Sequence, residues 1–236
     1  MRPGPVVLVI VLLALAGVCV RMGLWQHARW VEKSASNARL EFMLRSGPES
    51  IADGAALRAR RTDKVQLGGH FDLSRHLVLS REPEEGGVGV DVVTPFRMND
   101  GTLVLVDRGW MPVDSAEAAH PERFTRADST CIVALARPLA GGHSRLPWVR
   151  LEGDVLQRWS TLHVDPDTLA ARWPDVANDV WLVALPECTA DSLKRFAPQM
   201  PSPQTHLSYA VQWAIFTIAA LGGVVVVVAR ERKRVA

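Results

Sequence analysis

Tyrosine and cysteine are scarce in this sequence. Tyrosine occurs once, at Tyr209, and the three cysteines, Cys19, Cys131 and Cys188, stand far apart. None of the cysteines belongs to a C-x-x-C pair, which argues against a zinc site or a thioredoxin-like centre. The net charge is only +2, and no basic stripe is interleaved with aromatic residues, so no nucleic acid partner is expected.

The motifs of the common enzyme classes are also missing. The sequence has no H-E-x-x-H, P-loop, nucleophile elbow or dinucleotide fingerprint. Asp165 and Asp167 flank Pro166 where a helix is expected to begin, and aspartate is a common cap there. Three histidines are isolated in the sequence: His120, His143 and His163. We therefore expect a protein that is not an enzyme.

Apolar residues gather at the two ends of the chain. Pro5 to Val20 carries no charge, and residues 22–25 extend the run past Arg21, whose long side chain can reach the membrane interface. We expect an uncleaved membrane anchor here. A removable signal peptide is the alternative, because residues 14–16 resemble a cleavage site.

The C-terminal run is longer and is followed by basic residues. Tyr209 to Ala229 is uncharged and long enough to cross a bilayer, and residues 230–234 read RERKR. The positive-inside rule places this tail in the cytoplasm, and two spans return the N-terminus to the same side. Because no Arg-rich and Ser-rich leader precedes the first span, we expect a bacterial inner membrane, with the middle of the chain in the periplasm.

The middle of the chain has the short β-branched runs and turn residues of a β-rich domain. The fold class predicted is a membrane protein in which two transmembrane α-helices flank an extracytoplasmic, antiparallel β-rich α+β domain, either a barrel or a sandwich. Its divisions are an anchor at 1–25, the domain at 26–205, and the second span with its tail at 206–236. Strands are expected at Val65–Leu67, His76–Leu79, Val88–Arg97, Thr102–Trp110, Cys131–Leu135 and Val180–Leu185.

Local signals add detail to this domain. A hairpin turn is expected at 99–101, where Gly101 supplies the positive φ that the turn needs, and a helix at Asp167–Arg172. The helix that leaves the first span is expected to reach about Ser46, with a break near 34–36 as an alternative. Cys131 and Cys188 could form a disulfide if their strands pair, or remain two buried thiols.

Three sequence blocks stand in a fixed order between and beside the spans. The first is GLWQHARWVEK at 23–33, with Trp25, Gln26 and Arg29 at its centre. The second runs from Gly69 to Pro112 and includes GHFD, Arg81, Gly89, VTPF and VLVDRGWMP. The third is HLSYAVQW at 206–213. At 100° per residue, its His206, Tyr209 and Trp213 fall within about 60° on one helical face.

Together these blocks resemble the signatures of the SURF1 family of cytochrome c oxidase assembly factors, over nearly the whole chain. The resemblance implies assistance in assembling a haem–copper oxidase around the insertion of haem a into its large subunit, subunit I. Other oxidase assembly proteins and the membrane lipid are the remaining expected partners. Asp107 stands where the family usually has Asn, and in the second block we expect mainly fold maintenance, with Gly109 at a bulge or close approach and Thr94-Pro95 at a strand end.

The resemblance also implies a site for haem a at the periplasmic mouth of the spans. We expect His206 to be an axial ligand of the haem iron, because a neutral imidazole binds it well. Arg29 or Arg21 would pair with the propionates, and His27 is a second candidate ligand. The expected haem-binding residues are His206, Tyr209, Gln212, Trp213, Trp25 and Arg29. The alternative is a membrane-tethered scaffold for oxidase subunits that binds no cofactor.

Overall fold

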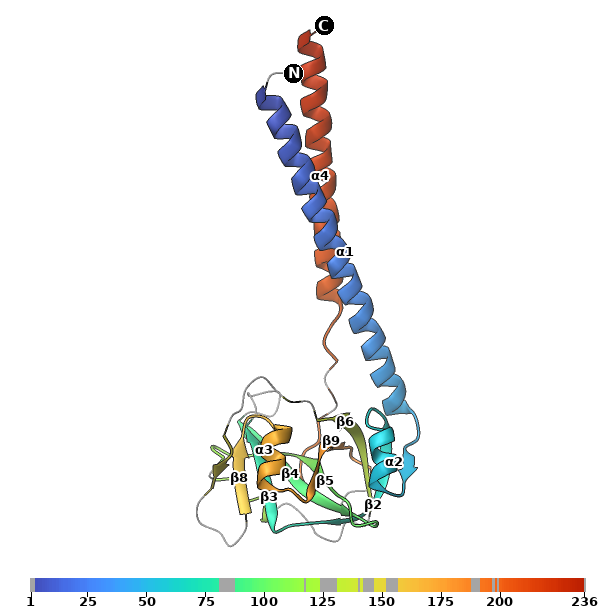
Figure 1. The fold of residues 1–236 in the computed structure, drawn as a ribbon, viewed down its shortest axis with the longest axis vertical. Coiled ribbons are helices and arrows are strands. Elements are labelled where there is room, and N and C mark those ends of the chain that lie inside the picture. The colour runs from blue at the N-terminus through green and yellow to red at the C-terminus, as the bar shows by residue number, and fades with distance from the viewer. Residues whose placement is uncertain are drawn as a thin grey trace. The chain divides into compact units, whose positions relative to one another are not determined.

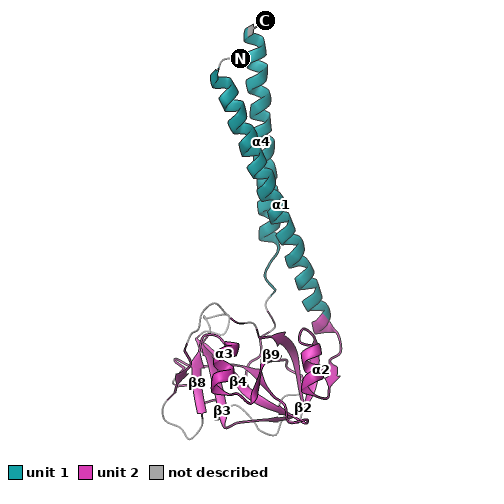
Figure 2. Ribbon diagram, in the orientation of Figure 1, with its two compact units in different colours: residues 1–42, 199–236 teal, residues 43–198 magenta. Residues whose placement is uncertain are grey.

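The structure is a computed structural model that describes residues 3–80, 88–116, 118–123, 131–139, 141, 147–151, 157–187, 192–196, 198 and 200–235. The chain divides into two compact units (Figure 2). Unit 1 contains residues 1–42 and 199–236, and unit 2 contains residues 43–198. The divisions drawn from the sequence, at 25/26 and 205/206, follow the expected membrane boundaries rather than compactness, and they stay a prediction.

Unit 1 is an antiparallel pair of long helices, α1 (Pro3–Arg45) and α4 (Gln204–Val235) (Figure 1). The 43 residues of α1 and the 32 of α4 measure about 64 and 48 Å at 1.5 Å per residue. A bilayer core is about 30 Å thick. Both helices are long and apolar enough to cross a membrane, by length and composition. The alternative of a break near residues 34–36 is wrong, because α1 is continuous there.

The facing side chains of the two helices alternate in steps of three and four residues. On α1 the less exposed positions are 12, 16, 19, 23 and 26, and on α4 they are 206, 210, 213, 217 and 220. This spacing is typical of coiled-coil packing. Ala16, Cys19 and Ala220 are buried. We call these positions the seam of the helix pair.

In the sequence, small residues at four-residue spacing, Ala210 with Ala214 and Ala219 with Gly223, predict a close approach to the first span near 14–17. This prediction is only partly right. Ala16, Ala210 and Gly223 lie on the less exposed side, and a Cβ on Gly223 would approach Leu12 Cδ1 at 3.2 Å. Four other small residues that were expected at the interface are exposed: Ala14, Gly17, Ala214 and Ala219. A strict four-residue stripe drifts away from a seam whose period is 3.5 residues, which explains the difference.

Unit 2 is built on one nine-stranded sheet of order β1-β2-β6-β9-β5-β4-β3-β8-β7 (Figure 1). The strands are β1 (Glu49–Ile51), β2 (Lys64–Phe71), β3 (Arg75–Ser80), β4 (Gly89–Met98), β5 (Leu103–Pro112), β6 (Cys131–Pro138), β7 (Val149–Arg150), β8 (Gln157–Thr161) and β9 (Val176–Ala184). The other elements are α2 (Gly54–Ala59), the short 3₁₀ helix η1 (Pro121–Arg123) and α3 (Pro166–Arg172).

An additional pairing of β2 with β4 closes part of this sheet into a barrel, so a barrel replaces the sandwich alternative. The closed ring runs β2-β6-β9-β5-β4 and returns to β2, while β3, β8 and β7 extend beyond it. Its interior is filled by side chains that include Val65, Phe96, Val104, Ile132 and Leu182, all fully buried. Burying such aliphatic and aromatic groups supplies about 1.5–3 kcal/mol each, and this core holds unit 2 together.

The expected antiparallel sheet is only partly right, because six of the nine strand pairings among the described residues are antiparallel. Three pairings are parallel: β1 with β2, β3 with β8, and β5 with β9. Turn residues reveal only strands that are neighbours in the chain and antiparallel, whereas parallel partners need longer connections that carry no comparable signal.

The six expected strands correspond to β2, β3, β4, β5, β6 and β9, and the expected helix to α3. The 99–101 turn joins β4 and β5, with Gly101 at φ +89°. Thr94 and Pro95 lie inside β4 rather than at its end. There β4 changes partner from β3 at Val93 to β2 at Phe96, so the missing N–H of proline interrupts neither pairing.

Candidate functional site

The histidine expected to bind haem iron contacts the other helix of unit 1. Nδ1 of His206 on α4 lies 2.8 Å from Oε1 of Gln26 on α1. Both side chains are half-buried and occupy seam positions. Because an amide oxygen can only accept a hydrogen bond, Nδ1–H is the donor.

One helical turn away, the two helices approach closely at a glycine. A Cβ on Gly23 would lie 3.4 Å from Cβ of Trp213 and 3.7 Å from the carbonyl oxygen of Ala210. The ring of Trp213 meets that of Phe216 edge to face, with centroids 5.8 Å apart. Gly23 thus leaves room for Trp213 beside α1. We call Gly23, Gln26, His206 and Trp213 the His206 cluster.

The other expected haem-binding residues do not join this cluster. Trp25 and Tyr209 are 52% and 49% exposed, and Gln212 is exposed as well. Arg29 pairs with Glu32 on its own helix, at 2.7 Å between Nη1 and Oε2. The predicted set therefore divides into seam residues, which face the other helix, and outward-facing residues. A ligand on the outside of α1 and α4 would contact the outward-facing residues.

The remaining cation and imidazole expected at this site also face outward. His27 is exposed and its ring centroid lies 5.4 Å from that of Trp30, and Arg21 is exposed. Gln26 was part of the quoted block but was not assigned to the site. A signal for it existed, because Gly23, Gln26 and Trp30 follow the steps of three and four that define the seam.

The His206 cluster can supply one nitrogen ligand. With its hydrogen on Nδ1, the neutral ring has its lone pair on Nε2, and within the described residues Nε2 has no hydrogen-bond partner. One imidazole is enough for an axial site on haem iron, since the porphyrin provides the equatorial nitrogens. Trp213 and Phe216 add aromatic surface next to it. The chemistry of these residues thus fits a haem.

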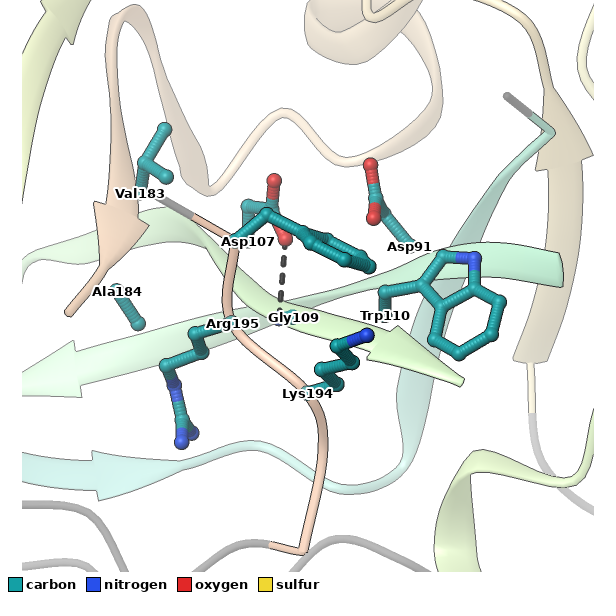
Figure 3. A pocket seen from close by; sticks show the side chains of 9 residues that line it. Asp91, Asp107, Gly109, Trp110, Val183, Ala184, Lys194 and Arg195 are labelled. Carbon is teal, nitrogen blue, oxygen red and sulfur yellow. Dashed lines mark hydrogen bonds between the residues drawn. The ribbon is translucent and has the colours of Figure 1, made fainter. Parts of the chain in front are cut away.

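A second site lies in unit 2, where β5 meets the segment 192–196, which we call the strap. Trp110 donates its N–H to the carbonyl of Lys194 at 2.7 Å and accepts the N–H of Lys194 at 2.9 Å. Gly109 has φ +123°, and a Cβ there would lie 2.8 Å from the Lys194 carbonyl oxygen. Its N–H donates to Oδ1 of Asp107 at 3.0 Å (Figure 3). The expected close approach at Gly109 is confirmed.

The strap and β5 enclose a cavity of about 30 Å³ (Figure 3). This volume suits one or two water molecules rather than an organic ligand. Lys194 Nζ lies 4.6 Å from the ring centroid of Phe196, and the rings of Phe196 and Trp110 pack edge to face at 5.7 Å. The cavity is lined by Asp91, Asp107, Gly109, Trp110, Val183, Ala184, Lys194, Arg195 and Phe196. We interpret it as the docking point of the strap.

Charged residues elsewhere in unit 2 also serve the fold. The guanidinium of Arg108 is fully buried and lies 3.6 Å from the ring centroid of Phe71. Arg75 bridges Asp72 at 2.7 Å and Asp175 at 2.8 Å. Its hydrogen bonds hold the pKa of Asp175 below the ordinary value. Burial raises the pKa of Asp72, but the hydrogen bonds from Ser74 and Arg75 outweigh it, so that pKa is lowered as well.

Two features expected from the sequence lie outside the described residues. Arg81 of the second block is one of them, and Cys188 is the other. The Cys131–Cys188 disulfide therefore stays a prediction. Cys131 itself accepts a hydrogen bond from Nε2 of Gln66, with Nε2 and Sγ 3.3 Å apart.

Two apolar helices flank a β-rich sheet unit, and this arrangement is consistent with a membrane protein that carries a β-rich domain. The SURF1 family model matches residues 13–218, which is most of the chain. A SURF1-like protein of Rickettsia felis is 23% identical over 214 residues, covering 86% of this chain and 89% of the relative. The chain belongs to the SURF1 family. Membership implies a role in oxidase assembly, and the family consists of assembly factors rather than known enzymes.

Proposed function

We propose that this chain is an assembly factor for a haem–copper cytochrome c oxidase and that it holds haem a transiently during insertion into the large subunit. Family membership supports the assembly role. The observation that carries the haem part is the His206 cluster, in which Gln26 occupies Nδ1 of His206 and leaves Nε2 as the ligating nitrogen. Haem a, once bound, would supply the metal centre that the oxidase needs.

The chain's own residues would hold this group in distinct ways. His206 binds iron through Nε2, and Trp213 with Phe216 packs against the apolar macrocycle. Trp25, Tyr209 and Gln212 are exposed on the same pair of helices and are available to the outer face of the ligand. Arg29 could exchange its Glu32 partner for a propionate at little cost, since an exposed ion pair contributes only about 0–1 kcal/mol.

We further propose that both termini lie in the cytoplasm and unit 2 in the periplasm of a bacterial inner membrane. The support is the basic run at 230–234, directly after an uncharged helix. This arrangement brings His206, at the first turns of α4, close to the periplasmic surface. Subunit I of the oxidase and other assembly proteins are the partners that the role requires.

Complementation of a bacterium that lacks its own SURF1 protein tests the role. The wild-type chain should restore an oxidase with its full haem a content, whereas His206→Ala should restore the subunits but with a several-fold lower haem a content. Equal haem a content with both chains, together with capture of subunit I by both, would show a scaffold without cofactor. No restoration by the wild-type chain would contradict the assembly role.

A further inference from the structure

We propose that Gln26 is a positioning residue that sets which nitrogen of His206 meets the iron and keeps that ligand weak enough to release haem. This inference rests on the proposed function, because it assigns a role in the haem site. It assigns a role to a residue of α1 that was not among the expected haem-binding residues. The starting observation is the 2.8 Å contact between residues 180 positions apart in the chain.

The contact is held in place by the packing of the helix pair. Gln26 follows Gly23 by about one turn, and a Cβ on Gly23 would already lie 3.4 Å from Cβ of Trp213. Gln26 and His206 are both half-buried. On the far side of the cluster, Asn37 Nδ2 donates to the carbonyl of Pro201 at 3.0 Å, just before α4 begins. Side-chain hydrogen bonds therefore tie α1 to the first turn of α4, through His206, and to the segment just before it, through Pro201.

The chemical state of the His206 ring depends on the hydrogen-bond acceptor that Gln26 provides. The Gln26 oxygen accepts from Nδ1–H, which fixes the tautomer and directs the lone pair to Nε2. Ligands of metal ions are commonly oriented by such an acceptor on the other ring nitrogen, and its loss typically costs about 10- to 100-fold in affinity. An acceptor with a negative charge raises the basicity of the imidazole more than a neutral one does. A glutamine thus orients the imidazole ring of His206 and raises the basicity of that ring only slightly.

This combination suits a protein that must pass its ligand on. A carboxylate beside His206 would strengthen the iron–nitrogen bond, and a charge in a half-buried position near a membrane is costly. An apolar side chain would leave Nδ1 without an acceptor and both tautomers accessible. Glutamine is the neutral choice that keeps the ring ordered.

The test uses the full-length protein in detergent, purified from cells that synthesise haem a. Gln26→Leu keeps the volume of the side chain and removes the acceptor, and Gln26→Glu keeps an acceptor oxygen. Gln204→Leu makes the same change at an exposed glutamine in the first turn of α4 and is the matched control. The readouts are haem affinity, the iron–histidine stretching frequency by resonance Raman, and the tautomer of His206 by nitrogen NMR of the haem-free protein.

The proposal expects Gln26→Leu to bind haem about 10- to 100-fold more weakly, with a shifted stretching frequency and a mixture of tautomers. Gln26→Glu should bind at least as tightly as the wild type and release haem more slowly, and Gln204→Leu should match the wild type. If His206→Ala abolishes haem binding but Gln26→Leu equals the wild type, the positioning role is overturned and the proposed function stands. If the wild type binds no haem, the proposed haem function fails; an Nε2–H tautomer in that protein would overturn the inference as well.

Discussion

Trp110 and Lys194 exchange both of their backbone hydrogen bonds, at N···O distances of 2.7 and 2.9 Å. This bridge fixes the strap to β5 in unit 2, and the chain continues from the strap toward α4. Residues 107–110 of the second sequence block, which read DRGW, lie at or next to this bridge. These residues of the second block make packing contacts at the bridge, and the role of the block in fold maintenance stays a prediction.

Gly109→Ala should destabilise unit 2. A side chain there meets both a positive φ of +123° and the Lys194 carbonyl at 2.8 Å, and strain of this kind costs about 1–3 kcal/mol. Urea unfolding of the full chain in detergent, followed by tryptophan fluorescence, measures the loss. Gly47→Ala, where a Cβ would find open space, is the control and should unfold like the wild type. Equal stability of both variants would contradict the docking of the strap.

Stability of unit 2 should fall in acid because of Arg75. The folded pKa values of Asp72 and Asp175 lie below their ordinary value of 3.8. A carboxyl of this kind stabilises the folded state when the pH is above its unfolded pKa of 3.8, and this stabilisation is lost as the pH falls through the folded pKa. The urea midpoint should therefore begin to drop as the pH approaches the ordinary value of 3.8 and keep falling as the pH passes through the lowered pKa values of the two carboxyls. Arg75→Gln should lower the midpoint at neutral pH and flatten this dependence; an unchanged slope would refute the assignment.

Gly23 should tolerate alanine but not leucine. A Cβ would make ordinary contacts with Trp213 at 3.4 Å, whereas a longer side chain must push α4 away. The separation of α1 and α4 can be measured by oxidative cross-linking in a protein without its native cysteines. New cysteines replace Leu12 and Gly223, which are adjacent across the helix pair. We expect near wild-type yield for Gly23→Ala and a several-fold lower yield for Gly23→Leu. The same yield for both would contradict close packing at this glycine.

The orientation in the membrane can be measured in intact cells. A cysteine replacing Val235 should be protected from a membrane-impermeant maleimide, because the basic run at 230–234 keeps the tail in the cytoplasm. A cysteine replacing Asn99, in an exposed turn of unit 2, should be labelled. Both proteins should label after the cells are lysed. The reverse pattern would place unit 2 in the cytoplasm and end the proposal for a periplasmic site.

The sequence predicted the helices and the local hairpin of this fold well. Apolar runs define α1 and α4, although Arg21 interrupts the first of them. Gly101 marks a turn that joins neighbouring antiparallel strands. The short helix α2 and the strands β1, β7 and β8 were missed. Two or three residues, as in β1 and β7, carry no periodic pattern, and QRWST in β8 does not alternate between apolar and polar residues. Parallel pairing and the closure of β2 on β4 depend on contacts between distant segments, which no local signal reveals.

The candidate site was predicted in part for the same reason. Helical spacing placed His206, Tyr209 and Trp213 near one face of α4, but it did not show which of them would turn toward α1. His206 and Trp213 do, while Tyr209 stays half exposed. The partner of His206 is set by the register between two helices at opposite ends of the chain. Gln26 can be selected only when the seam positions of both helices are aligned with each other, with Gly23 as the position where the helices come closest.

The haem content of the purified protein tests the central claim most directly. Wild type and His206→Ala are purified in detergent from cells that make haem a, and bound haem is quantified from the pyridine haemochrome spectrum, with His120→Ala as a control in unit 2. The account predicts haem a on the wild type and the control, and at least about tenfold less on His206→Ala. Equal haem a on all three proteins, or none on the wild type, would contradict it.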